Sequence, residues 1–313
     1  MEKKISARQI VSFLRQNHIT YEYCGDGSEE CEGFSSIVDY KNNTLTWLKS
    51  YEKYLEFLNK GIFIEWDNIS LIVVDKETSD CISFVNAIIC DNPKQVFYRI
   101  VEYFYSNTET KEPVGRHTFI DEKAQIAEGV VIGNGCYIGK NVVIGEKTKI
   151  YHNVVINSGV RIGKNCCIKS GAVIGEEGYG YFESDGKFQR VFHSGSVVIE
   201  DNVDIGANTC IDKGTIHNTK IGEGSKIDNL CHIAHNVQIG KNVSIVAGVI
   251  VAGSTSILDN AYIAPGAIIR NQLSIGKGGI VGMGSVVTRD TKECMVYTGV
   301  PAKTIRKKGK ENL

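Results

Sequence analysis

Residues 119–175 read FIDEKAQIAEGVVIGNGCYIGKNVVIGEKTKIYHNVVINSGVRIGKNCCIKSGAVIG, with an isoleucine at every sixth position from Ile120 to Ile174. After an interruption the step resumes at Ile199, slips by four residues after Ile211, and runs from Ile221 to Val287. Neither the 3.6-residue period of a helix nor the two-residue period of a strand explains a step of six. Self-similarity at a short fixed period indicates a solenoid.

A six-residue unit fits a short strand followed by a tight turn, and three units close one triangular coil. We expect about eight coils, each pairing with the next along parallel ladders about 4.8 Å apart. The isoleucine points inward, together with a smaller residue two positions earlier, such as Val142 or Thr148. Glycine or asparagine often follows the isoleucine, as at Gly133 and Asn157, and we expect a positive φ there.

The rest of the chain divides around this repeat. Residues 1–115 lack the six-residue step and predict a small α/β domain, residues 116–290 form the β-helix, and residues 291–313 form a short basic tail. The two interruptions, 175–198 and 212–220, predict loops thrown out from corners of the solenoid, where function usually resides. In the first domain we expect helices at Ala7–Asn17, Leu48–Asn59 and Lys94–Tyr105, and strands at Ser70–Val74 and Ala87–Cys90.

Composition argues for small-molecule chemistry. The 35 Lys and Arg residues nearly balance the 36 Asp and Glu residues, so the charge does not indicate a nucleic-acid or anionic-membrane partner. The first residues lack the apolar centre of a signal peptide, and no stretch is long enough to span a membrane, so we expect a cytoplasmic protein. The ten cysteines include no C-x-x-C pair, which argues against zinc. Cys136, Cys166 and Cys231 occupy inward repeat positions and are interpreted as small buried hydrophobes.

Four segments resemble the UDP-3-O-acylglucosamine N-acyltransferases of lipid A synthesis, within the hexapeptide-repeat acyltransferases. The resemblance implies a left-handed parallel β-helix, a homotrimer with sites between subunits, and no permanently bound cofactor. The acyl group would come from a thioester of coenzyme A or of the phosphopantetheine of an acyl carrier protein. The segments are Ser170–Gly180 (SGAVIGEEGYG), Asp204–Gly214 (DIGANTCIDKG), Ile227–Gly240 (IDNLCHIAHNVQIG) and, in the first domain, Cys90–Ile100 (CDNPKQVFYRI).

His235, in the Ala-His-Asn segment, matches the catalytic base of that family. An amine that attacks a thioester must lose a proton, and the ordinary histidine pKa of about 6.5 suits that task. A solvated corner histidine is the competing interpretation. Gly253 follows His235 by eighteen residues and Asn271 by thirty-six, so both are expected on the same edge, with Gly253 leaving room for a thioester.

The resemblance also implies binding residues. The first domain of the family holds uracil against aromatic side chains, and Trp47 and Tyr54 lie in the matching region, although the Asn-Pro of the family motif is absent. Both aromatics are equally consistent with a packing role in that domain. The other substrate-binding candidates are Tyr179, Asp228, Asn229 and His232; His232 also has the simpler interpretation of a polar corner residue.

The C-terminal end departs from the family. Arg270-Asn271 replaces a Gly-His pair, Ser285 replaces a methionine that limits the acyl channel, and the ending Thr298–Lys303 resembles coenzyme-A-dependent sugar acetyltransferases. A basic tail suits the phosphates of coenzyme A, and a frayed, solvated terminus is an equally good interpretation. The donor-binding candidates are Gly253, Arg270, Asn271, Ser285, Lys303 and Arg306.

The sequence therefore predicts an N-acyltransferase for a UDP- or dTDP-linked amino sugar, with coenzyme A favoured over acyl carrier protein as the donor. The alternative is UDP-3-O-acylglucosamine N-acyltransferase itself, using a 3-hydroxyacyl group on acyl carrier protein. Two hypotheses from other classes stay open, namely a β-helical scaffold and a nucleotidyltransferase with a β-helical tail. Residues 1–115 contain no glycine-rich phosphate loop opening a helix, which disfavours the latter.

Overall fold

The computed structural model describes residues 4–105 and 113–307, and the chain divides into two compact units, Met1–Glu109 and Thr110–Leu313. The first unit is built on a five-stranded sheet with strand order β2-β7-β6-β5-β4. The strands of this unit are β1 (Ile5–Ser6), β2 (Glu22–Cys24), β3 (Glu30–Cys31), β4 (Gly33–Phe34), β5 (Thr44–Trp47), β6 (Ile69–Val74) and β7 (Ala87–Ile89). Its helices are α1 (Ala7–Gln16), α2 (Tyr51–Asn59), the short 3₁₀ turn η1 (Trp66–Asn68), α3 (Lys76–Cys81) and α4 (Pro93–Tyr105).

The helices of the first unit begin where side chains cap them. The Ser6 hydroxyl accepts a hydrogen bond from the Gln9 backbone N–H, and the Gln9 side chain accepts one from the Ser6 N–H, which fixes the start of α1. The predicted helix at Leu48–Asn59 begins three residues late, because the Ser50 side chain caps α2. Helix α3, which the sequence analysis did not predict, begins in the same way after Asp75.

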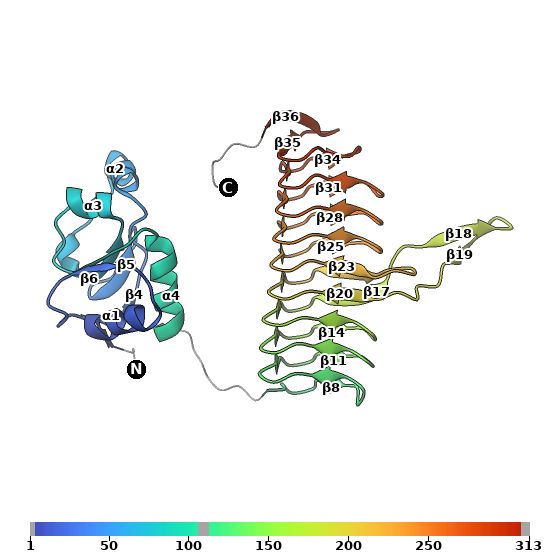
Figure 1. Ribbon diagram of the computed structural model, residues 1–313, viewed down its shortest axis with the longest axis horizontal. Coiled ribbons are helices and arrows are strands. Elements are labelled where there is room, and N and C mark those ends of the chain that lie inside the picture. Colours follow the sequence, from blue (N-terminus) through green and yellow to red (C-terminus); the bar gives the residue numbers. More distant parts are fainter. Residues whose placement is uncertain (1–3, 106–112, 308–313) are drawn as a thin grey trace. The chain divides into compact units, whose positions relative to one another are not determined.

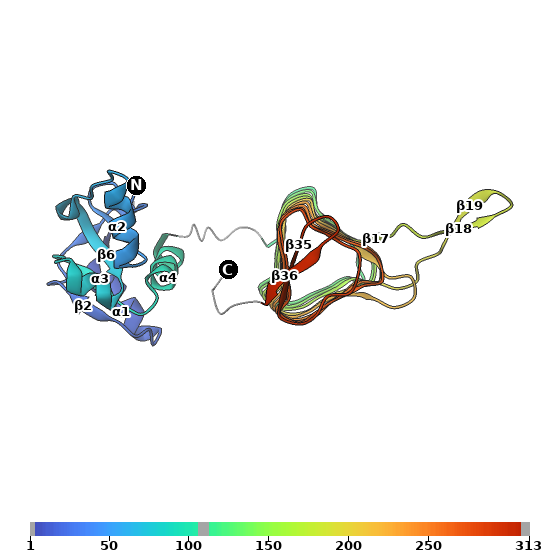
Figure 2. The ribbon, with the colours of Figure 1, turned by 90° about the horizontal axis from the view of Figure 1, so that it is seen from above.

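The second unit is a parallel β-helix, as predicted, with a triangular cross-section (Figure 2). We name its three sheets by their first strands, β8, β9 and β10; Figure 1 labels most strands of the β8 sheet. The β8 sheet holds β8 (Phe119–Ile120), β11 (Tyr137–Ile138), β14 (Val155–Ile156), β17 (Val173–Glu177), β22 (Cys210–Lys213), β25 (His232–Ile233), β28 (Ile250–Val251), β31 (Ile268–Ile269) and β34 (Val286–Val287). The β9 sheet holds β9 (Gln125–Ile126), β12 (Val143–Ile144), β15 (Arg161–Ile162), β20 (Val197–Ile199), β23 (Thr219–Ile221), β26 (Gln238–Ile239), β29 (Ser256–Ile257) and β32 (Ser274–Ile275).

The β10 sheet completes each coil. Because each coil adds one strand to every sheet, the eight strands of the β9 sheet mark eight complete coils in the described residues, and β34 and β35 begin a ninth. Its strands are β10 (Val131–Ile132), β13 (Lys149–Ile150), β16 (Cys167–Ile168), β21 (Asp204–Ile205), β24 (Lys226–Ile227), β27 (Ser244–Ile245), β30 (Tyr262–Ile263), β33 (Ile280–Val281), β35 (Met295–Thr298) and β36 (Lys303–Lys307).

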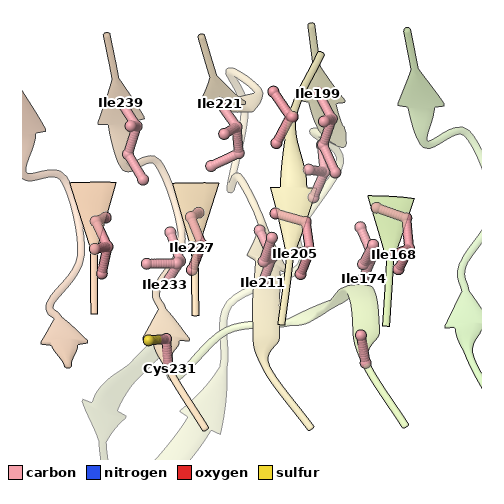
Figure 3. Close-up of a cluster of buried hydrophobic side chains, with 14 of the residues drawn as sticks. Ile168, Ile174, Ile199, Ile205, Ile211, Ile221, Ile227, Cys231, Ile233 and Ile239 are labelled. Atoms are coloured by element: carbon pink, nitrogen blue, oxygen red, sulfur yellow. The ribbon is translucent and has the colours of Figure 1, made fainter. Parts of the chain in front are cut away.

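Isoleucine side chains from successive coils fill the prism (Figure 3). Ladder partners such as Ile211 and Ile233 are fully buried, and so are the smaller inward residues. Cys136, Cys166 and Cys231 are each 2% exposed, which confirms their predicted inward positions. Truncating one such isoleucine to alanine should cost about 2–5 kcal/mol of the free energy of unfolding.

The backbone conformation at the corners differs from the prediction. With the exception of Gly175, the glycines that directly follow an isoleucine do not adopt a positive φ; the other left-handed residues lie elsewhere in the turn, at positions such as Asn141 and Asn236. Gly133 is required for another reason, since a Cβ there would lie 2.6 Å from the backbone carbon of Tyr151 in the next coil. Close approach between coils, rather than a positive φ, therefore explains that glycine.

The two segments that interrupt the repeat project outward from one edge of the prism. Strands β17 and β22 run past the corner side by side, with Glu176 opposite Asp212, and the antiparallel hairpin of β18 (Tyr181–Ser184) and β19 (Lys187–Arg190) projects from it (Figure 1). Part of the predicted tail forms two strands. Strand β35 pairs with β33 and with β36, so residues 295–307 extend the β10 sheet.

Candidate active site

His235 lies on a corner between β25 and β26, and we call the line of equivalent corners the His235 edge. The Asn236 backbone is left-handed, with φ 62°, and its N–H donates to the Thr219 hydroxyl at 2.9 Å. The Asn236 side-chain oxygen accepts from the Thr215 N–H at 2.8 Å, and its amide nitrogen lies 3.1 Å from His235 Nδ1. The second interruption thus fixes the asparagine that orients the imidazole.

Gly253 lies beside the imidazole, one coil further along. The Ser254 N–H donates to the His235 carbonyl at 2.9 Å, and a Cβ at Gly253 would lie 2.7 Å from both Cε1 and Nε2 of His235. In the next coil the Gln272 N–H donates to the Gly253 carbonyl at 3.0 Å. The predicted alignment of His235, Gly253 and Asn271 on one edge is therefore confirmed, and Arg270 and Asn271 are exposed there.

The first interruption covers the other side of His235. A Cβ at Gly178 would lie 2.9 Å from His235 Cβ and Cδ2, so only glycine allows the chain this close. Tyr179 hydrogen-bonds the imidazole through its backbone, while its side chain is 83% exposed and packs against Tyr181 at 4.9 Å between ring centroids. Both interruptions therefore contact the corner that carries the histidine.

Burial lowers the pKa of His235 below its usual 6.5, and the nearby charges of His193 and His232 lower it further. The backbone hydrogen bond to Tyr179 acts in the opposite direction. A histidine with a lowered pKa is neutral at pH 7, which is the form that accepts a proton.

Two residues of this site were not among the predicted site residues. His193 is 1% exposed, and its ring meets that of His235 edge to face at 5.7 Å between centroids. Asp212 is 7% exposed, and burial raises its pKa to about 7. Both lie inside the interruptions of the repeat, and that position is the sequence signal that would have found them.

His232 stands on the outward face of β25, three residues before His235. Its Nε2 lies 3.7 Å from Asp212 Oδ2, and burial lowers its pKa. The structure therefore joins His232 to the site through Asp212.

Asp228 and Asn229 lie on a different corner, between β24 and β25, and we call that line of corners the Asp228 edge. The Asn229 side-chain oxygen accepts from the Ala207 N–H at 2.6 Å. The two residues line a hollow of about 590 Å³ together with Lys169 and Tyr262. Within one chain the width of the β8 sheet separates this hollow from His235.

Three predicted donor residues are placed away from the His235 edge. Ser285 is fully buried in the small inward position two residues before Val287, and its hydroxyl accepts from the Gly299 N–H at 3.1 Å. Its prediction as a donor-binding residue is wrong, because the hydroxyl faces the prism interior. Lys303 and Arg306 are exposed on β36, at the end of the β10 sheet.

Trp47 and Tyr54 are half-buried at the margins of two separate hydrophobic clusters. Trp47 contacts Phe97 at 6.2 Å between ring centroids, and Tyr54 contacts Trp66 at 5.4 Å. The structure does not bring these two aromatics together, so a shared role in stacking on a base stays a prediction.

Residues 4–105 and 113–307 contain neither a candidate metal site nor a candidate membrane span. No group of three or more His, Cys, Asp or Glu side chains there is arranged to hold a metal ion. None of the helices in these ranges is long and apolar enough to cross a membrane.

Comparison with known proteins identifies the family of the chain. The family model for the bacterial transferase hexapeptide (six repeats) matches residues 114–146, 141–176 and 218–253, and the hexapeptide repeat of succinyl-transferase matches residues 196–229. A UDP-3-O-acylglucosamine N-acyltransferase of Methylobacillus flagellatus is 33% identical over 251 residues, which cover 74% of this chain and 68% of the relative. The chain belongs to the UDP-3-O-acylglucosamine N-acyltransferase family.

Other members of this family match shorter stretches. The relative from Methylacidiphilum infernorum is 38% identical over 67% of this chain, and the one from Leptothrix cholodnii is 41% identical over 47%. The chain spans 63% and 49% of these two relatives. Among solved structures, the UDP-N-acetylglucosamine acyltransferases of Francisella novicida and Bacteroides fragilis superpose with TM-scores of 0.55 and 0.56, at 32% and 28% identity. They cover 60% and 62% of this chain, which spans 67% and 73% of those chains.

Proposed function

We propose that this protein transfers an acyl group from an acyl thioester to the amine of a UDP-linked glucosamine derivative, with His235 as the general base. The observation that carries the proposal is the imidazole of His235, whose pKa is lowered by burial and which is oriented by Asn236, enclosed by both interruptions of the repeat and adjacent to Gly253. A β-helical scaffold has no need for this enclosure. The family membership supports the same chemistry.

The mechanism is direct attack by the amine on the thioester carbonyl. His235 accepts a proton from the amine as the carbon–nitrogen bond forms, and the carbon–sulfur bond then breaks to release the thiol. Backbone N–H groups of the corners supply donors for the oxyanion. A covalent relay through Cys231 is disfavoured, because this thiol is buried in the prism and burial raises its pKa.

The acceptor is proposed to be UDP-linked rather than dTDP-linked. The printed names of the relatives specify UDP-3-O-acylglucosamine or, for Wigglesworthia glossinidia brevipalpis, UDP-3-O-(3-hydroxymyristoyl)glucosamine. This support favours the lipid A alternative over the broader dTDP- or UDP-sugar hypothesis. Tyr179 and His232, on either side of His235, are proposed to contact the sugar, and Trp47 and Tyr54 the base.

The acyl donor is proposed to bind along the His235 edge beyond Gly253, where Arg270 and Asn271 are exposed. The buried position of Ser285 removes one of the arguments for coenzyme A as the carrier. We therefore propose an acyl thioester as the donor, and an assay with both carriers identifies whether coenzyme A or acyl carrier protein supplies it.

We further propose a homotrimer in which the Asp228 edge of one subunit faces the His235 edge of the next. Two features support it: the separation of the two edges within one chain, and an apolar ladder on the outer face of the β8 sheet. Packing three prisms around one axis would turn corners into grooves and cover this ladder. The ladder consists of Phe119, Tyr137, Val155, Val173, Ile250, Ile268 and Val286, and it is interrupted by Cys210 and His232 beside the site.

The experiment is a free-thiol release assay with the purified full chain. Short and long acyl groups on coenzyme A and on acyl carrier protein are tested against UDP- and dTDP-linked amino sugars. We expect amine-dependent thiol release with a UDP-linked glucosamine derivative that carries a 3-O-acyl group. Turnover with dTDP-linked sugars alone would contradict the acceptor, and the absence of transfer to any amine would contradict the proposed function.

A further inference from the structure

Two buried proton-accepting groups beside His235 lack hydrogen-bond donors. Among the described residues, no donor lies within hydrogen-bonding distance of the Asp212 carboxylate, and its nearest basic atom is His232 Nε2 at 3.7 Å. His193 Nδ1 lies 2.8 Å from the Val191 carbonyl oxygen, which can only accept, so Nδ1 carries the hydrogen of the neutral ring. The lone pair is then on Nε2, which is buried and has no partner in the described residues.

These groups and His235 lie under one short segment of chain. A Cβ at Gly178 would lie 2.9 Å from His235 Cβ and 3.2 Å from Asp212 Oδ2, so the two residues flank the same glycine. A Cβ at Gly180 would lie 2.8 Å from His193 Cε1. Buried acceptors without donors are costly, and this cluster is therefore suited to a ligand that is rich in donors and positively charged.

Proton balance identifies a need for such a group. An amino sugar near neutral pH binds largely as an ammonium ion, and its nitrogen must lose two protons to become an amide nitrogen. His235 accepts one of them and returns it to the departing thiolate. The other must leave before the nitrogen has a lone pair with which to attack, and it requires a second acceptor within reach of the nitrogen.

We infer that Asp212 is a second catalytic residue, which binds the acceptor nitrogen as an ammonium ion and accepts its first proton, leaving His235 for the second. His193 acts as a positioning residue whose Nε2 lone pair faces the same cluster. This inference rests on the proposed function. Asp212 would then also make the enzyme select an amine acceptor over a hydroxyl acceptor, because a hydroxyl group brings no charge for the carboxylate to bind.

The ionisable groups around Asp212 come from three parts of the fold. Glu176 on β17 raises its pKa, His193 before β20 lowers it, and His232 and His235 come from β25 and the corner that follows. Glu177 is paired with Lys213 at 3.3 Å beside them. With a carboxyl pKa of about 7, ammonium binding should strengthen as the pH rises through 7, because the charged carboxylate forms there.

The test compares UDP-glucosamine with UDP-glucose, which differ by an amine or a hydroxyl at one carbon. Binding to the full chain is measured by calorimetry between pH 5.5 and 8, with and without a non-transferable thioether analogue of the donor. We expect the wild type to prefer the amine, increasingly so as the pH rises from 5.5 to about 7, where the carboxylate forms while the amine is still an ammonium ion. Asp212→Asn, which keeps the shape of the side chain, should weaken amine binding about ten- to a hundredfold and remove its pH dependence, while UDP-glucose binding stays within about twofold.

The controls separate this inference from the proposed function. His235→Asn should retain the preference for the amine while losing turnover. His193→Gln, which keeps a side-chain acceptor, should lower the preference for the amine less than His193→Leu does. If wild-type binding shows the preference but no acyl group is transferred, the function fails and the ammonium site stands. Equal effects of Asp212→Asn on both sugars, or a wild-type preference that does not change with pH, would overturn the inference.

Discussion

Gly253 lies so close to the His235 ring that a Cβ at residue 253 would be 2.7 Å from both Cε1 and Nε2. No positive φ is involved at this glycine, so its absence of a side chain serves the approach of the imidazole alone. The histidine and the glycine are one coil apart, so the solenoid itself aligns the base with the open space beside it.

Gly253→Ala should displace the imidazole while leaving the prism intact. We expect kcat to fall by about 10²-fold, because a displaced base loses much of its contribution, with a small change in the melting temperature. Gly33→Ala is the matched control, since Gly33 has no positive φ and a Cβ there meets no atom within 4 Å. Unchanged turnover in Gly253→Ala would show that the ring position does not matter.

The pKa of His235 should lie below 6.5 when its imidazole is titrated by NMR, because burial disfavours the charged ring. The neutral base is then already present at pH 7 and is lost as the pH falls through that lowered pKa. His193→Gln removes an ionisable ring that lowers the pKa of His235, and should therefore raise that pKa. A wild-type value at or above 6.5, or a decrease in the variant, would contradict this electrostatic account.

Ile268→Lys should dissociate the proposed trimer, because it places a charge in the apolar ladder of the β8 sheet. Light scattering at micromolar concentration should give about three times the 34.4 kDa chain mass for the wild type and less for the variant. Ser256→Lys, on the polar ladder of the β9 sheet next to Gln238 and Ser274, is the control and should stay trimeric. A monomeric wild type that keeps full activity on dilution would defeat the shared-site proposal.

Much of this architecture could be predicted because the repeat determines it. A step of six places every isoleucine inside and every eighteenth residue on one edge, so the alignment of His235 and Gly253 follows from counting. The same count also places Ser285 inside, two residues before Val287, and the resemblance to the family obscured that consequence.

The environment of His235 could not be predicted by counting residues along the repeat. His193 and Asp212 belong to the interruptions, where no period relates position in the sequence to position in space. Their approach to His235 depends on how β17 and β22 extend beyond the corner and on glycines at 178 and 180. The need for glycine after the isoleucine likewise arises from contact between coils, which a single hexapeptide does not contain.

The most direct test of the account is the turnover of His235→Asn in the thiol release assay, beside His117→Asn as a control at an exposed histidine outside this cluster. The account predicts that His235→Asn lowers kcat by about 10²–10⁴-fold, the usual contribution of a positioned general base, with the melting temperature and trimer unchanged. His117→Asn should behave as wild type. Wild-type turnover in His235→Asn would contradict the central claim that this histidine accepts the proton of the attacking amine.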